Sequence, residues 1–316
     1  MNLDRHRLQK VWVRGFWKGL RSFLWVVEIL IPISLFTALL QWSGWINYLD
    51  LFLRPAMGWL HLPAMAAVPL TIALCTGIYG GIAAMTVLPF SQGQMTLMAI
   101  FMLIAHSLIQ ETVIQAKSGL HPFKAIPFRL CCAILTVLAV APFLDTTQET
   151  IASSAPAVPF SLPFLAMLSD WSISMLSLSS KIFLLVMSIL ILLEILKALD
   201  VIHLIVRTLA PVLRLLGLDE RVGIPWIAGA FFGLVYGSAV ILEEAREGHL
   251  KREELERLQL SIGINHSMIE DPALFLSLGL SPFWLWVPRL LMAMLAVRLL
   301  NLWHRSRKNS ARKEQP

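Results

Sequence analysis

Two short polar motifs could carry chemistry in this otherwise apolar chain. Ala105–Glu111 reads AHSLIQE, and Asn265–Asp271 reads NHSMIED. Each motif offers an imidazole, a hydroxyl and acidic or amide groups, which can bind a polar solute, a proton or a metal ion. His266 and Glu270 are four residues apart, so on a helix they share one face. The candidate divalent-metal ligands are His106, Glu111, His266, Glu270 and Asp271.

The two motifs belong to a longer internal repeat. Gly77 and Gly81 return as Gly233 and Gly237 at an offset of 156 (233 − 77), and Pro55 returns as Pro211. After a four-residue insertion the offset is 160 (266 − 106), which also aligns 119–123 and 129–130 with 279–283 and 289–290. Internal duplication in an apolar chain is typical of transporters in which two related halves enclose a site near the bilayer midplane.

The elements that must position these motifs are membrane helices. Apolar residues make up 57% of the chain, charged residues only 15%, and the mean hydropathy is +0.71, which excludes an ordinary soluble globular protein. Spans of roughly 20 apolar residues are predicted at 22–42, 64–88, 96–116, 127–144, 181–199, 223–242 and 284–302. Segment 256–276 is more polar and predicts a hairpin or broken helix that other helices shelter.

The net charge of +6 does not indicate nucleic acid, because the basic residues gather at the two ends of the chain. They predict cytoplasmic flanks. The first apolar run is as long as a full span and no small-residue cleavage site follows it, so we expect a retained helix rather than a signal peptide. The three cysteines have no ligand-like spacing and are expected to act as small hydrophobic residues: Cys75, Cys131 and Cys132.

The distribution of Lys and Arg predicts that the two halves are inverted. The connector from Asp145 to Ser180 contains neither residue and is expected outside, whereas both termini are expected in the cytoplasm of a bacterium. Each half then crosses an odd number of times. This requires three crossings and one re-entrant hairpin per half, and we assign the hairpin to the His-Ser segment. One loop fits poorly, because Glu243–Arg257 would lie outside despite four basic residues. Four parallel crossings per half remain an alternative.

The predicted protein is an all-α polytopic membrane protein with two homologous repeats. The expected organisation is a basic cytoplasmic segment 1–21, repeat 22–144, an external linker 145–180, repeat 181–302 and a basic cytoplasmic tail 303–316.

The glycine rows allow two interpretations. Gly77 and Gly81, like Gly233 and Gly237, could permit close helix packing. They could instead mark unwound points that line a site. The candidate substrate-binding residues are His106, Ser107, Gln110, Glu111, Asn265, His266, Ser267, Glu270 and Asp271, with Gly77, Gly81, Gly233, Gly237 and Ser238 beside them.

At Gly77–Gly81, His106–Glu111, Gly233–Ser238 and Asn265–Asp271 the chain resembles the Gate, or nucleoside-recognition, domain superfamily of membrane proteins. That group includes spore maturation proteins A and B, the membrane part of ferrous-iron transporter B and, distantly, the concentrative nucleoside transporters. The resemblance covers both halves and implies solute or ion permeation through paired inverted gates. The chain has no Gly-x-x-x-x-Gly-Lys-Ser/Thr run, so a GTPase domain is not expected.

The leading hypothesis is a secondary transporter or permease for a small solute or ion, with a divalent-metal permease as its sharper version. The rival is a non-transporting membrane scaffold or a partner of another subunit. For the assembly, a homodimer and a complex with a partner membrane subunit are both left open. An intramembrane hydrolase is disfavoured, since adjacent His and Ser on a helix point about 100° apart. We therefore expect no enzyme activity and no cofactor.

Overall fold

The computed structural model describes residues 5–117, 120–146, 163–199, 208, 211–246 and 250–313, and its regular elements within these ranges are all helices. The all-α prediction is confirmed. The longer elements are α1 (Arg5–Trp42), α2 (Ile46–Trp59), α3 (Ala67–Thr76), α4 (Ile78–Met85), α5 (Gln92–Ala105), α6 (Leu108–Lys117), α7 (Pro122–Val140), α8 (Phe164–Ala198), α10 (Gly223–Arg246), α11 (Arg252–Asn265), α12 (Glu270–Leu276) and α13 (Pro282–Lys313). Short 3-10 turns occupy Ala64–Ala66, Ala141–Phe143 and Glu220–Val222.

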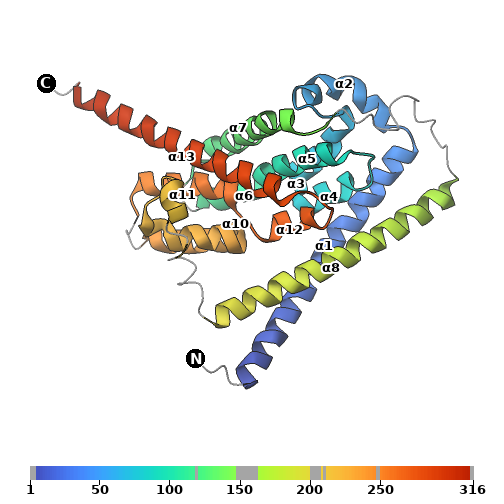
Figure 1. The fold of residues 1–316 in the computed structure, drawn as a ribbon, viewed down its shortest axis with the longest axis horizontal. Helices are drawn as coiled ribbons and strands as arrows, with labels where there is room; N and C mark the ends of the chain where they lie inside the picture. Colours follow the sequence, from blue (N-terminus) through green and yellow to red (C-terminus); the bar gives the residue numbers. More distant parts are fainter. Residues whose placement is uncertain are drawn as a thin grey trace.

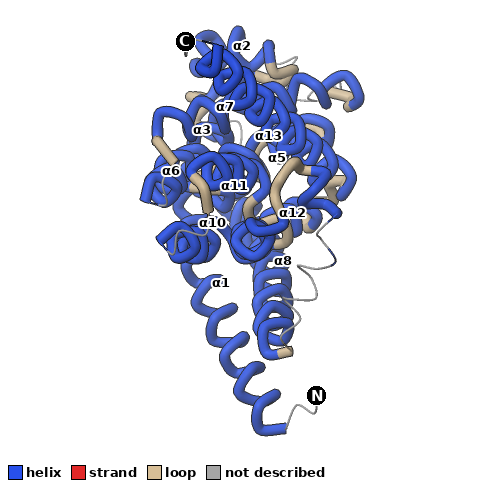
Figure 2. Tube along the Cα trace, turned by 90° about the vertical axis from the view of Figure 1, so that its left-hand side faces the viewer, coloured by secondary structure: helices blue, strands red, loops and turns tan. Residues whose placement is uncertain are grey.

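Two long helices, α1 and α8, form a pair on one side of the other helices, and both extend beyond them (Figures 1 and 2). Small residues bring the two axes together, because a Cβ on Gly15 would lie 3.0 Å from Ile191 Cα. Lys18 Nζ and Glu194 Oε1 form an ion pair at 2.6 Å across the pair. Both helices begin earlier than predicted. Arg5–Arg21 is already helical, and α8 extends from Phe164 into the segment predicted as a linker.

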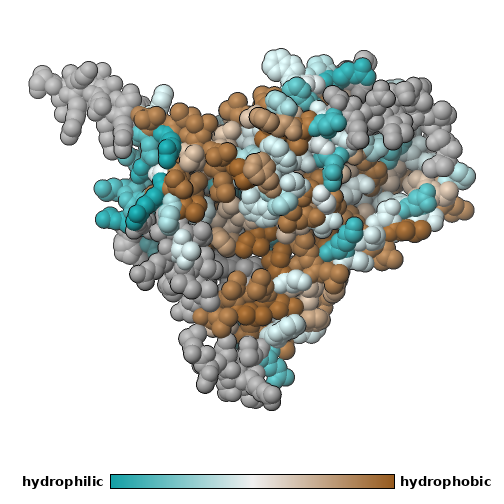
Figure 3. All heavy atoms as spheres, viewed as in Figure 1, coloured by the Kyte–Doolittle hydropathy of each residue, from teal (hydrophilic) through white to brown (hydrophobic). Residues whose placement is uncertain are grey.

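The remaining helices pack beside this pair around a shared hydrophobic core, with α5 buried at the centre and Leu30 of α1 and Ile182 of α8 also part of the core. α5 packs against α7, and α11 packs in the same way against α13. The face shown in Figure 3 has large apolar areas between hydrophilic ones. Large exposed apolar side chains include Trp17, Trp25, Ile173 and Leu295. Among the described residues, five helices are long and apolar enough to cross a membrane: Gln9–Trp42, Gln92–Lys117, Pro122–Phe143, Phe164–Leu196 and Pro282–His304. The chain is a membrane protein.

The predicted spans 64–88 and 223–242 are both interrupted at a glycine. Gly77 (φ 110°, ψ −179°) separates α3 from α4, and Gly233 (φ 84°, ψ 168°) breaks α10. Both conformations are essentially restricted to glycine. The chain folds back at each point, since a Cβ on Gly81 would lie 2.7 Å from Ala73 Cβ. Residues eight apart in a straight helix would be about 12 Å apart.

The equivalent contact recurs in the second half, where a Cβ on Gly237 would collide with the Gly229 backbone. The two interpretations thus apply to different glycines, with breaks at Gly77 and Gly233 and close packing at Gly81 and Gly237; that these glycines line a site stays a prediction. Gly77 and Gly233 turn the chain, whereas Gly81 and Gly237 let the two arms of each helical hairpin meet. We call α3–α4 the first hairpin and α10 the second hairpin.

The sequence repeat is also a repeat of local backbone structure. His61 and Gly217, 156 apart, both have positive φ angles, and Leu62 and Leu218 each donate a backbone hydrogen bond five residues back. Leu120 and Leu280, 160 apart, close the same turn onto Gln115 O and Phe275 O. The two halves therefore share their turns as well as their motifs.

Candidate functional site

The two His-Ser motifs lie at breaks in helices. α5 ends at Ala105 before α6 begins at Leu108, and α11 ends at Asn265 before α12 begins at Glu270. Ser107 (φ 45°) and Ser267 (φ 48°) are left-handed, a conformation uncommon for residues other than glycine. Gln92–Lys117 as a whole still qualifies as one membrane span. The sharp hairpins of the structure lie at Gly77 and Gly233, not at the motifs as predicted.

Each broken helix is fixed to the hairpin of its own half. The Ser107 N–H donates to Ala73 O at 2.9 Å, and the Met268 N–H donates to Ala230 O at 2.6 Å. The serine hydroxyls lie against the hairpin tips, since a Cβ on Gly77 would be 2.7 Å from Ser107 Oγ. The corresponding distance for Gly233 and Ser267 Oγ is 3.1 Å. Side chains larger than glycine would separate tip from motif.

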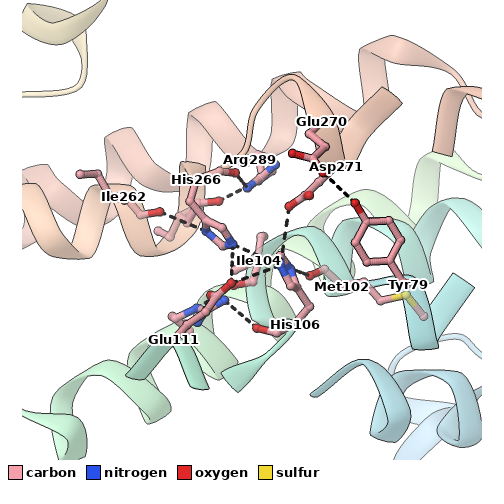
Figure 4. A network of polar contacts seen from close by, with 12 residues as sticks. Tyr79, Met102, Ile104, His106, Glu111, Ile262, His266, Glu270, Asp271 and Arg289 are labelled. Atoms are coloured by element: carbon pink, nitrogen blue, oxygen red, sulfur yellow. Dashed lines mark hydrogen bonds and ion pairs between the residues drawn. The ribbon is translucent and has the colours of Figure 1, made fainter. Parts of the chain in front are cut away.

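The two histidines meet at the centre of the molecule (Figure 4). His106 Nε2 and His266 Nε2 are 3.4 Å apart, and the ring centroids are 4.9 Å apart. Both residues are buried, with exposures of 6% and 1%. Each Nδ1 faces a carbonyl of its own helix, Met102 O at 2.8 Å and Ile262 O at 3.2 Å. These contacts fix both rings so that Nε2 points to the centre.

Two buried carboxylates complete the cluster. Glu111 Oε1 lies 3.2 Å from His106 Nε2 and 3.1 Å from His266 Nε2. Asp271 Oδ2 lies 3.6 Å from His106 Nε2 and accepts no hydrogen bond among the described residues. His106, His266 and Asp271 present ligand atoms that all lie within 4.8 Å of one another. We call His106, His266, Glu111 and Asp271 the histidine centre.

Two buried arginines hold the backbone of the broken helices. Arg129 donates to Ile104 O and His106 O at 2.9 and 3.0 Å. Arg289 donates to Ile264 O and His266 O, both at 2.7 Å. Since the break leaves these carbonyls without helical partners, the arginines supply the missing donors. The sequence repeat had aligned Arg129 with Arg289, yet neither was predicted as a site residue.

The two arginines differ in their contact with acid. Arg129 Nη1 forms an ion pair with Glu111 Oε2 at 2.6 Å. Arg289 Nη1 is buried without a hydrogen-bond partner among the described residues. The repeat places Asp271 opposite Glu111 in the alignment, and aspartate is shorter by one methylene group. The second half thus leaves its carboxylate oxygen available to the centre.

The other predicted site residues have different positions. Gln110 is exposed on α6, away from the centre, and Glu270 accepts a hydrogen bond from Tyr79 OH at 2.7 Å. This bond joins the first hairpin to the second half. Asn265 is fully buried, and neither of its amide atoms has a partner among the described residues. The Ser238 side chain lies outside the described part of the chain.

The centre is closed in this conformation, because its four residues are at most 8% exposed. An open pocket of about 420 Å³ lies elsewhere, between the start of α5, the Gly279 turn and Asp145, and no residue of the histidine centre lines it. Access to the centre therefore requires a rearrangement of the helices around it.

One relative supports the membrane assignment. The chain is 24% identical over 301 residues to an uncharacterized membrane protein, YvoD, of Bacillus subtilis (strain 168), and the match covers 93% of this chain and 94% of the relative. No family model matches the chain, and no solved structure matches it significantly. The comparisons and the helices together identify a multi-helix membrane protein.

Proposed function

We propose that this membrane protein is a permease that moves a small polar solute or ion past the histidine centre. One observation carries the proposal: two motifs 160 residues apart meet with their imidazole nitrogens 3.4 Å from each other. Buried ionisable groups at membrane depth are costly and usually mark a transport path or an ion site. Breaks in helices that shelter such groups are the arrangement found in secondary transporters.

The proposed orientation puts both termini in the cytoplasm of a bacterium and inverts the two halves. We count α1, α5–α6 and α7 as the crossings of the first half, and α8, α11–α12 and α13 as those of the second. Each glycine hairpin then enters and leaves on one side. α11–α12 is too polar to qualify as a span by composition, but it is the repeat counterpart of Gln92–Lys117, which does qualify.

This arrangement removes the poor fit of the basic loop. With the hairpin moved from the His-Ser segment to α10, the loop between α10 and α11 faces the cytoplasm, and its residues Arg246, Lys251 and Arg252 obey the positive-inside preference. The Lys- and Arg-free connector after Asp145 stays outside. The charge pattern therefore supports three crossings and one glycine hairpin per half.

A transport role is favoured over an enzymatic one by the position of the serines. Ser107 Oγ and Ser267 Oγ lie against the hairpin glycines, and among the described residues neither imidazole of the centre forms a hydrogen bond with a serine. A nucleophilic serine needs a base within hydrogen-bond reach. Binding of a solute needs only the converging polar atoms of the centre.

The test is ligand binding and flux in purified protein. Nucleosides, organic anions and divalent metals are screened for a rise in melting temperature, since a ligand of the folded state stabilises it. Positive ligands are then measured for uptake into proteoliposomes. We expect the double variant His106→Ala/His266→Ala to lose both signals, whereas His121→Ala, an exposed histidine before α7, keeps them.

The scaffold alternative predicts the opposite result. If no ligand shifts the melting temperature and no solute enters proteoliposomes, the permease proposal is wrong. The same conclusion follows if a solute is taken up equally well by wild type and the double histidine variant.

A further inference from the structure

The hydrogen atoms of the histidine centre are constrained by the backbone. Met102 O and Ile262 O can only accept, so each Nδ1 that faces them must carry the hydrogen. In a neutral imidazole the other nitrogen, Nε2, then has a lone pair and no hydrogen. When both rings are neutral, His106 Nε2 and His266 Nε2 therefore face each other as two acceptors.

The carboxylates add further acceptors to the same point. Glu111 Oε1 is within 3.2 Å of both Nε2 atoms, and Glu111 Oε2 is already paired with Arg129. Asp271 Oδ2 is buried and accepts no hydrogen bond among the described residues. Four acceptor atoms without a donor between them repel one another unless a cation lies among them.

From this geometry we propose that the cargo of the permease is a divalent transition-metal ion, which His106 Nε2, His266 Nε2, Glu111 Oε1 and Asp271 Oδ2 hold at the centre. The proposal rests on the proposed transport function and names its substrate class. Imidazole with carboxylate suits Zn²⁺, Fe²⁺ and Mn²⁺, and no soft thiolate or thioether ligand is part of the described centre.

The spacing of the acceptors suits a four-coordinate ion. Bonds of about 2.0–2.1 Å in a tetrahedron place neighbouring ligand atoms about 3.3 Å apart. The measured separations are 3.4 Å between the two nitrogens and 3.2 and 3.1 Å from them to Glu111 Oε1. Asp271 Oδ2 lies 3.6 Å from His106 Nε2, and its ligand atom is within 4.8 Å of both imidazoles, so Asp271 must move closer to complete the four-coordinate site.

The surroundings are those of metal-binding histidines. A ligating imidazole usually donates its other N–H to a carbonyl or carboxylate, which fixes the ring and its tautomer. Both histidines do so here, and Arg129 and Arg289 hold the carbonyl groups of His106 and His266 themselves. The two Arg contacts come from helices α7 and α13, so movement of either helix would move a ligand.

The binding test uses detergent-purified full-length protein from which any polyhistidine tag has been removed, because a tag binds the same metals. The protein is treated with EDTA, passed through gel filtration and titrated with Zn²⁺ or Co²⁺. We expect one Zn²⁺ per chain and the visible absorption of tetrahedral Co²⁺. His106→Ala and His266→Ala should each weaken binding by at least about tenfold, the smaller end of the effect of losing even an outer-shell partner.

Matched variants separate binding from folding. His121→Ala is the control, since it removes an exposed histidine that is not part of the centre. If an alanine variant fails to fold, Asp271→Asn provides a second test. It keeps the shape of the side chain and should weaken binding. Lack of Zn²⁺ and Co²⁺ binding by wild type would overturn the proposal and leave a shared proton as the cation. Unchanged binding in both histidine variants would overturn it too.

Uptake of ⁶⁵Zn²⁺ into proteoliposomes distinguishes this inference from the proposed function. Histidine-dependent uptake supports both. If an organic solute is taken up in a histidine-dependent way while no metal binds, the permease proposal stands and the metal assignment is wrong. If metal binds at the centre without crossing the membrane, the assignment of the metal as cargo is wrong.

Discussion

Arg129 and Arg289 do the same work in the two halves, except that only Arg129 also pairs with a carboxylate. We predict that Arg129→Met lowers the free energy of unfolding by about 3–5 kcal/mol, because Glu111 would remain as an uncompensated buried charge. Arg289→Met should cost less, about 1–3 kcal/mol, because it only removes donors from two backbone carbonyls. Reversible denaturation in detergent measures both, and equal losses would contradict the asymmetry.

A single hydroxyl joins the first hairpin to α12. Tyr79 OH donates to Glu270 Oε1, and removing a bond to a charged group typically costs about 1.5–3 kcal/mol. Because Glu270 is partly exposed, water replaces some of this, and we expect Tyr79→Phe to cost about 1 kcal/mol. Tyr48→Phe, at a tyrosine that is 76% exposed on α2, is the control and should leave the unfolding midpoint unchanged. Equal midpoints for the two variants would mean that the hydroxyl bond contributes nothing.

The predicted and observed centres differ at residues whose role depends on a partner far along the chain. His106, Glu111, His266 and Asp271 could be selected from the sequence, because ionisable groups in apolar segments are expensive. Gln110 was selected because it lies four residues after His106, as Glu270 lies four after His266, but it is exposed. Arg129 and Arg289 are near helix starts and looked like loop charges. Their role is to donate hydrogen bonds to backbone carbonyls that the helix breaks leave without helical donors. These carbonyls belong to residues 25 and 23 positions away in the sequence.

Among the helical elements, the hairpins lie at glycines and not at the most polar segments. The His-Ser segments are polar because they are buried against the opposite half, and this polarity resembles that of a re-entrant loop. Gly77 and Gly233 adopt backbone angles that other residues avoid, yet sequence alone could not separate that requirement from close packing. The positions of the motifs were predictable, whereas the glycine turn that contacts each motif was not.

Alanine substitution separates the two kinds of glycine. Gly77→Ala should destabilise the protein by about 1–3 kcal/mol, because φ 110° strains any residue with a Cβ. The new methyl group would also contact Ser107 Oγ at 2.7 Å, and uptake through the centre should fall with stability. Gly58 lies within α2, and a Cβ there meets no atom within 4 Å. Gly58→Ala should therefore be neutral or stabilising by about 0.5–1 kcal/mol. A stable and active Gly77→Ala would contradict the role of this turn.

At the scale of the whole molecule, the proposed topology combines three features that no single element explains. Six crossings return both termini to one side, three crossings per half invert the repeat, and each glycine hairpin is hydrogen-bonded to the motif of its own half. The long α1–α8 pair packs on one side of the other helices (Figure 2) and presents exposed apolar side chains such as Trp17 and Leu184. In a bilayer these exposed faces contact lipid, whereas Leu30 on α1 and Ile182 on α8 are buried in the hydrophobic core.

The side of the membrane on which the loop between α10 and α11 lies shows which segment of the second half is the hairpin. In a background without Cys75, Cys131 and Cys132, single cysteines are placed by Thr146→Cys, Lys251→Cys and Lys10→Cys. If α10 is the hairpin, a membrane-impermeant maleimide should label Thr146→Cys in intact cells. It should label Lys251→Cys only after permeabilisation, like the N-terminal reference Lys10→Cys. If the His-Ser segment were the hairpin, Lys251→Cys would be labelled in intact cells together with Thr146→Cys. The inverted arrangement would survive that result, but the pairing of each motif with a glycine hairpin would not.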